Sequence, residues 1–161
     1  MYTGRSEKNR KRIKRKPTPV KTDNTYPTAA AYNQLRKQVG WYLLDENMIE
    51  TAFSNSLYCV SVRHEGELIG FGRIIGDKSM FFSIHDVIVA STWQNKGIGK
   101  FIMTEIVNYL NNTFAENRVV ELMAEKDKEG FYEQFGFLRR PNDFLGAGMT
   151  MLTKKDGNNP D

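Results

Sequence analysis

The chain has a single cysteine, Cys59, and only two histidines in 161 residues. One cysteine excludes an internal disulfide, and in its apolar surroundings Cys59 fits a small core side chain better than a nucleophile. His64 and His85 stand apart from Cys59 without the spacing of metal ligands. We therefore predict no metal site and no covalent cysteine mechanism.

Long apolar runs are also missing. None approaches the ~20 residues of a membrane-spanning helix, and the N-terminus is polar and basic where a secretory signal would be apolar. We expect a cytoplasmic protein with no membrane partner, monomeric or homodimeric. Its length suits one domain.

Charge is unevenly distributed. Residues 1–21 carry nine Lys or Arg against one Glu, a charge of +8, which leaves −4 on the remainder of a chain whose net charge is +4. The expected organisation is a basic, disordered tail (1–21), one domain (22–153) and a polar C-terminal end (154–161). The tail is either a solvated leader or an arm that contacts nucleic acid. The net negative charge of the remaining chain favours a cationic substrate such as an amine.

Hydrophobic spacing predicts an alternation of helices and strands. The expected helices are 29–39, capped by Thr28 and ended by Gly40, then 46–54, 96–110 and a short one carrying 131–135. The expected strands are 57–63, 68–75, 80–89 and a buried 119–124, followed by two closing runs at 137–139 and 149–153. A helix between the last two of these four strands predicts parallel pairing there. The fold class is therefore α/β (α+β), with a mixed, mainly antiparallel central sheet flanked by helices.

A glycine-bearing loop, Gln94-Asn95-Lys96-Gly97-Ile98-Gly99, lies between an expected strand and an expected helix. Such a loop suits phosphate, because glycine lets the backbone approach a ligand and a helix start offers unpaired N–H groups. A dinucleotide fingerprint fails because position 102 is Ile, and a nucleotide P-loop fails at Gln94 and Phe101.

The pattern Gln-x-x-Gly-x-Gly after a strand resembles the acyl-CoA-binding loop of the GNAT superfamily of N-acetyltransferases. A second segment, Phe131-Tyr132-x-x-x-Gly136-Phe137, resembles the aromatic segment that closes the same site. Further similarity extends over residues 26–153 and resembles a small bacterial-type branch, with some likeness to aralkylamine N-acetyltransferases.

The resemblance implies acetyl-CoA as cofactor and assigns residues to it. Backbone groups of Val87, Ile88 and Val89 would pair with the pantetheine arm and supply an oxyanion donor. The pyrophosphate would lie on the loop of Gln94, Asn95, Lys96, Gly97, Ile98, Gly99 and Lys100, where the two lysines either add charge or are merely solvated.

Tyr132 matches the family tyrosine that protonates the departing sulfur; its alternative is core packing. For the base the sequence offers His85 and Asp86, adjacent on the strand before the loop. An ideal pleat points them to opposite faces, with His85 on the side of Val87 and Val89, although a bulge would upset that alternation. Histidine's ordinary pKa suits a base at neutral pH, whereas aspartate would need an upward shift or would bind the cationic amine.

The acceptor pocket is less defined. Candidate lining residues are Trp41, Tyr42, Arg73 and Phe144, and Arg73 can instead form a salt bridge with Asp77 or Asp86. The sequence predicts an acetyl-CoA-dependent N-acetyltransferase that acts on a primary amine of a small molecule by direct attack in a ternary complex. Two alternatives remain: a protein or peptide amine as acceptor, and a non-catalytic acyl-CoA-binding regulatory module that docks through its basic tail.

Overall fold

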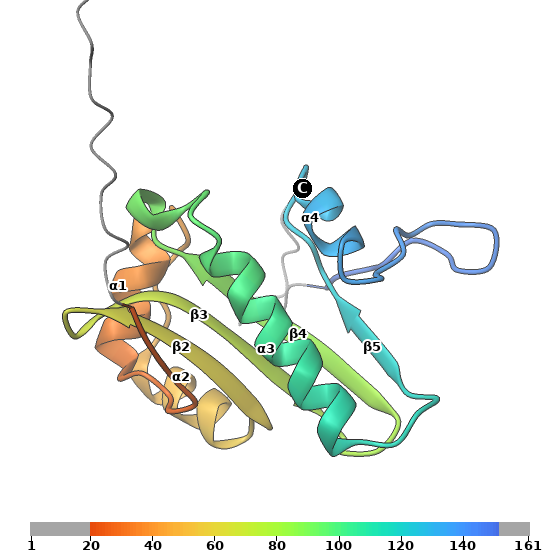
Figure 1. The fold of residues 1–161 in the computed structure, drawn as a ribbon, viewed down its shortest axis with the longest axis horizontal. Coiled ribbons are helices and arrows are strands. Elements are labelled where there is room, and N and C mark those ends of the chain that lie inside the picture. The colour runs from red at the N-terminus through yellow and green to blue at the C-terminus, as the bar shows by residue number, and fades with distance from the viewer. Residues whose placement is uncertain (1–19, 152–161) are drawn as a thin grey trace, which may run out of the picture.

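The computed structural model describes residues 20–151 as a five-stranded sheet with helices on both faces (Figure 1). The elements are β1 (Lys21–Asp23), α1 (Ala29–Gln38), α2 (Glu46–Ser54), β2 (Tyr58–His64), β3 (Glu67–Gly76), β4 (Phe81–Val89), the 3-10 helix η1 (Ser91–Trp93), α3 (Ile98–Thr113), β5 (Val119–Leu122) and α4 (Glu129–Glu133). The strands follow the order β1-β2-β3-β4-β5. Only the β4–β5 pair is parallel, which confirms the expected mixed, mainly antiparallel sheet.

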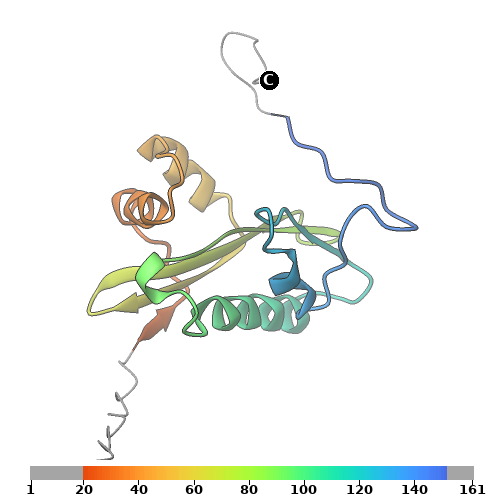
Figure 2. The same ribbon diagram turned by 90° about the horizontal axis from the view of Figure 1, so that it is seen from above.

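The helices form two layers around the sheet: α1 and α2 cover one face and α3 covers the other (Figure 2). Side-chain caps begin the first two helices. The Thr28 hydroxyl accepts from the Ala31 N–H at 3.2 Å, and the Asp45 carboxylate accepts from the Met48 N–H at 3.1 Å. None of the helices within residues 20–151 combines the length and apolar character needed to cross a bilayer.

Glycines in β3 let α3 approach the sheet closely. A β-carbon on Gly72 would stand 2.6 Å from Ile102 Cγ2, and one on Gly70 would stand 2.9 Å from Ile98 Cγ2. Both distances are too short for real side chains, so α3 packs on β3 backbone at these positions. Ile98 and Ile102 are buried there with Met103 and Ile106. This contact fixes the N-terminal end of α3 over the middle of the sheet.

Three expectations are wrong in detail. The polar strand β1 begins at Lys21, inside the expected tail, because its backbone completes the free edge of β2. The strand expected at 119–124 ends at Leu122 and is not buried, since β5 is an edge strand and Val119 is 48% exposed. Neither closing run forms a helix or strand within the described residues. The tail up to residue 19 and the C-terminal end lie outside the described residues, and so does every expectation about nucleic acid.

Candidate functional site

The glycine loop meets α3 without any side-chain cap. Gly97 occupies the N-cap position with φ of +84°, a left-handed conformation that favours glycine. No side chain caps the helix, and its first turn holds no acidic residue. The first backbone N–H groups of α3 and the positive end of its dipole are therefore available to an anion. Two exposed lysines, Lys96 and Lys100, flank this position, and the Lys96 ammonium lies 4.7 Å from the ring centre of Trp93.

The two sequence motifs meet in the structure. A β-carbon on Gly99 would stand 3.4 Å from Phe131 Cζ, so the first turn of α3 lies against α4. Gly136 has the expected left-handed conformation, with φ of +88°, but it lies three residues beyond the end of α4, whose C-cap is Gln134. Tyr132, the residue after Phe131 in α4, is partly buried. Its ring centre lies 5.0 Å from that of Phe131 and 6.4 Å from that of Phe137. Burial raises the pKa of the Tyr132 hydroxyl, and the charge of Glu125 adds to this, so the phenol is protonated at neutral pH.

Beside this helix, β4 and β5 separate. Their parallel pairing runs from Phe81 opposite Val119 to Ile84 opposite Leu122. The chain then leaves the sheet toward α4 while β4 continues to Val89 (Figure 1). The part of β4 at 85–89, which includes Val87, Ile88 and Val89, is thus paired with β3 on one side only. Its other backbone edge is open for an extended ligand that adds to the sheet. The Gln94 side chain closes the end of this edge by donating to the Val89 carbonyl at 3.1 Å.

A bulge lies at the point where β5 ends. Phe71 pairs with Ile88 and Arg73 with His85, so Gly72 alone faces the two residues Asp86 and Val87. Asp86 adopts φ of +57° to accommodate the extra residue. Because paired residues share a face, His85 lies on the α1 and α2 side with Arg73. The Asp86 carboxylate lies on the same side, where Arg73 binds it, whereas Val87 lies 3.7 Å from the β-carbon position of Gly72 on the α3 side.

This geometry corrects the expected alternation. His85 does not share the side of Val87 and Val89; the bulge brings it to the same face as Asp86. Sequence spacing alone predicts that only one of His85 and Asp86 can meet a substrate. The structure brings both to one place.

Arg73 connects this pair to the helices. Its Nε lies 2.5 Å from Asp86 Oδ2, and its Nη1 donates to the Ser56 hydroxyl at 2.8 Å. Both ionic side chains are largely buried, with 15% of Arg73 and 12% of Asp86 exposed. Of the alternatives left open for Arg73, the structure therefore selects the salt bridge with Asp86.

His85 is partly buried beside this ion pair. Burial lowers the pKa of its imidazole, and the Arg73 charge lowers it further, while Asp86 and Glu121 act in the opposite direction. Its Nε2 lies 3.0 Å from the Ser83 hydroxyl. The imidazole is therefore neutral at neutral pH and able to accept a proton.

Sequence reasoning missed a buried arginine, Arg36, which is 5% exposed. Its Nη1 donates to the Tyr32 hydroxyl at 3.1 Å and its Nε to the Tyr42 carbonyl at 2.9 Å. Burial and the Asp86 charge raise the pKa of Tyr32 to about 12. The signal was present in the sequence, since a charged residue follows Tyr32 by four positions in the apolar stripe of a helix. Ser56, Ser83 and Glu121 carried no such signal.

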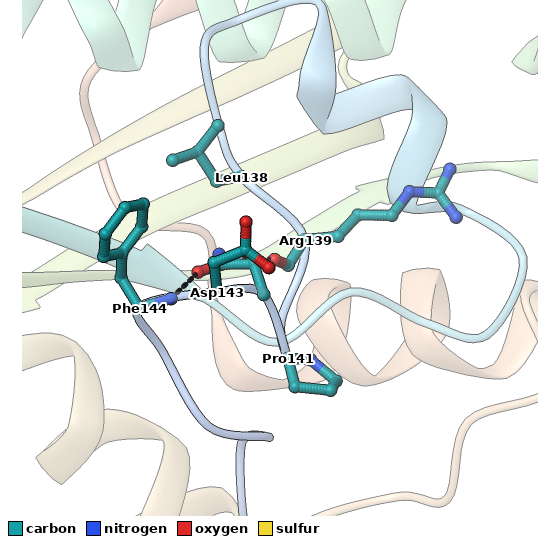
Figure 3. A pocket seen from close by; sticks show the side chains of 6 residues that line it. Leu138, Arg139, Pro141, Asp143 and Phe144 are labelled. Carbon is teal, nitrogen blue, oxygen red and sulfur yellow. Dashed lines mark hydrogen bonds between the residues drawn. The ribbon is translucent and has the colours of Figure 1, made fainter.

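The residues predicted to line the acceptor pocket do not lie together. Trp41 and Tyr42, between α1 and α2, place their rings 5.2 and 5.0 Å from the Arg36 guanidinium, so they connect through Arg36 and Tyr32 toward Asp86. Phe144 is 95% exposed. It lines a cavity of about 410 Å³ within the segment after α4, where its N–H bonds to Asn142 (Figure 3). No described contact brings Phe144 to the other three candidates.

Cys59 is buried, and burial raises the pKa of its thiol to about 12. A protonated, enclosed thiol is a poor nucleophile. Among residues 20–151, no three His, Cys, Asp or Glu side chains gather closely enough to hold a metal ion.

A family model described as an acetyltransferase (GNAT) domain matches residues 27–154. The chain belongs to the GNAT family of N-acetyltransferases. GNAT relatives support this membership at the level of sequence. The chain is 28% identical over 127 residues to the uncharacterized N-acetyltransferase ycf52 of Gracilaria tenuistipitata var. liui, a match that covers 76% of this chain and 69% of that protein. It is 27% identical over 131 residues to the chloroplastic serotonin N-acetyltransferase 2 of Oryza sativa subsp. japonica, with 79% and 64% covered.

A solved GNAT-like structure supports the fold. A probable acetyltransferase from meticillin-resistant Staphylococcus aureus is similar with a TM-score of 0.78 and 31% identity, over 84% of this chain and 100% of that one. The GNAT chain described here is therefore an acyltransferase, and GNAT enzymes generally use acetyl-CoA as co-substrate. The uncapped helix start and the open edge of β4 fit the two ends of such a coenzyme.

Proposed function

We propose that this GNAT protein transfers an acetyl group from acetyl-CoA to a primary amine of a small molecule, by direct attack in a ternary complex. One observation carries the proposal: the bulge places His85 and Asp86 on one face of β4, at the residue where β5 leaves the strand. A base therefore adjoins the open strand edge where an acyl donor would lie.

Residues of this chain can hold the coenzyme along one continuous path. The first amides of α3, with Gln94, Asn95, Lys96, Gly97, Ile98, Gly99 and Lys100, form the pyrophosphate end. Backbone groups of Val87, Ile88 and Val89 form the pantetheine end and offer an N–H to a developing oxyanion. When bound, acetyl-CoA supplies the thioester carbonyl that an amine attacks. Because this path has a place for the pantetheine arm as well as for the pyrophosphate, it supports acetyl-CoA over a nucleotide alone.

His85 is the base in this proposal. Its imidazole is neutral at neutral pH, because burial and Arg73 lower its pKa, so its ring nitrogen can take the amine proton directly or through Ser83. Asp86 is held by Arg73 and keeps the bulge in place. Tyr132 keeps its proton at neutral pH and can donate it to a departing thiolate.

The burial of Cys59 supports direct attack. A two-step mechanism needs a reactive nucleophile, and the only thiol is buried with its pKa raised to about 12. The rice relative is named for a small arylalkylamine, serotonin, which supports a small-molecule acceptor here. Since that relative is named chloroplastic, our expectation of a cytoplasmic protein stays a prediction.

The test is release of coenzyme A thiol from acetyl-CoA with a panel of polyamines, arylalkylamines, amino sugars, aminoglycosides and peptides. We expect turnover with a small amine and loss of about 10²-fold in kcat for His85→Gln. His64→Gln is the matched control, because His64 lies outside the bulge. Turnover with peptides alone would favour a protein acceptor. Tight coenzyme binding without turnover on any amine would favour the regulatory module.

A further inference from the structure

A cavity of about 540 Å³ lies on the α1 and α2 side of the sheet, and one of its lining residues, Ser83, contacts the proposed base. Its walls come from the end of α2, the second half of β3, the start of β4 and from β5. Two lining residues connect it to His85: Arg73 pairs with His85 across the strands, and the Ser83 hydroxyl lies 3.0 Å from His85 Nε2. An elongated molecule in this cavity that extends past Ser83 would therefore bring one end to His85.

The charged groups that line the cavity are two carboxylates and one guanidinium. Glu121 lies opposite Ser83 in the parallel pair and is exposed. Asp77 is ionised, because backbone N–H groups of Phe81, Ser79 and Met80 bond to its Oδ1 and lower its pKa. The Arg73 guanidinium is already bound to Asp86 and Ser56. The remaining charge that faces an occupant is negative, which favours a cation.

Glu121 and Asp77 lie beside successive positions along β4, at increasing distance from His85. Ser83, at the level of Glu121, precedes His85 by two residues, and Phe81, at the level of Asp77, precedes it by four. Because a strand rises about 3.3 Å per residue, the two levels lie roughly 7 Å and 13 Å from His85. Between the Glu121 and Asp77 levels the lining includes two apolar residues, Ile75 and Phe81, and Phe81 is 55% exposed. Methylene groups fit such a wall, and ammonium groups fit its two charged levels.

We infer that the acceptor is a linear aliphatic diamine or polyamine, with the reacting amine at His85 and a second ammonium at Glu121. The chain of a longer polyamine would continue along Ile75 and Phe81 toward Asp77. This inference rests on the proposed function, since it names the substrate class of the same site. A monoamine of equal length lacks the group that Glu121 would bind.

The test compares 1,4-diaminobutane with 1-aminobutane, which has the same chain and one amine fewer. The wild-type kcat/KM should favour the diamine by about fivefold or more, the value of one ion pair of about 1 kcal/mol. Glu121→Gln should remove most of this preference. Glu116→Gln, an exposed glutamate in the loop before β5, is the matched control and should retain it. Calorimetric titration of both amines into the coenzyme-free protein gives a second readout that does not depend on turnover.

The outcomes separate the inference from the function. Equal kcat/KM for the two amines, or the same preference in Glu121→Gln and Glu116→Gln, overturns the diamine assignment while the acetyltransferase proposal stands. Faster turnover of 2-phenylethylamine than of either aliphatic amine also overturns it, because the cavity would then select an aromatic ring. No turnover with any of the three, while another amine of the panel is acetylated, also overturns the diamine assignment. No turnover with any amine of the panel, despite coenzyme binding, counts against the proposed function itself.

Discussion

Gly99 and Phe131 are close neighbours: a β-carbon added to Gly99 would stand 3.4 Å from Phe131 Cζ. The two segments that resemble the family's coenzyme motifs therefore pack against each other. Phe131, which lies at this packing contact, also packs its ring against that of Tyr132. Alanine at 99 should fit at an ordinary contact distance, whereas a branched side chain should not.

Gly99→Val should displace α4 and weaken both stability and coenzyme binding. Overpacking of this kind costs about 1–3 kcal/mol, measurable by urea unfolding, and calorimetry with coenzyme A should show lower affinity. Gly99→Ala is the control and should stay close to wild type. Wild-type affinity in Gly99→Val would mean that α4 does not close the coenzyme site.

Tyr132→Phe should lower kcat by about 10²-fold without changing coenzyme affinity, because it removes only a proton donor. The ring contacts with Phe131 and Phe137 remain. Single-turnover acetyl transfer together with calorimetry checks this prediction, and Phe137→Leu controls for packing. An unchanged rate with a good acceptor would remove Tyr132 from the mechanism.

The pH–rate profile should report His85. The base is active when neutral, so kcat/KM should fall as pH falls through its pKa. Because burial and Arg73 lower that pKa, this acidic limb should lie below the ordinary value of 6.5. His85→Gln should abolish the limb. If Asp86→Asn abolishes it instead while His85→Gln retains it, Asp86 is the base.

The neighbours of His85 should shift that limb in opposite directions. Arg73→Gln removes a positive charge and should move it to higher pH, whereas Asp86→Asn removes a negative charge and should move it to lower pH. The acidic limb of kcat/KM measures both variants. Shifts in the same direction would show that the bulge itself has rearranged.

Asp86→Asn should also destabilise the fold by about 3 kcal/mol, near the low end for a broken buried ion pair, since both partners keep a little exposure. Asparagine tolerates the left-handed conformation at φ of +57°, so this variant tests the charge alone. Asp86→Ala adds backbone strain and should cost about 1 kcal/mol more. Urea unfolding measures both, and equal stability of Asp86→Asn and wild type would contradict a structural role for the pair.

Gly72→Ala should destabilise the protein by about 1–3 kcal/mol, because its β-carbon would stand 2.6 Å from Ile102 Cγ2 opposite the bulge. Gly146→Ala, where no atom lies within 4 Å of the β-carbon, is the control and should be nearly neutral. Thermal unfolding compares the two. Similar melting temperatures would show that α3 can move away from β3 at little cost.

Much of this fold could be predicted because its elements carry local signals. The stripe from Ile98 to Leu110 predicts α3, the Glu65-Gly66 turn predicts the β2–β3 hairpin, and Thr28 marks the start of α1. Strand β1 carried no such signal, since three polar residues form a strand only through the free edge of β2. The burial of β5 was overestimated because an apolar run does not show that its strand lies at the sheet edge.

The sequence by itself determined the family, the order of the main helices and strands from α1 to α4 and the glycine-bearing loop between β4 and α3, because glycine spacing and hydrophobic period are properties of short segments. The shared face of His85 and Asp86 was decided only by the tertiary structure. It depends on Gly72 from β3, Ile102 from α3 and the Arg73 side chain, which hold one extra residue in β4. A bulge is the joint result of such distant contacts, and no spacing within β4 specifies it.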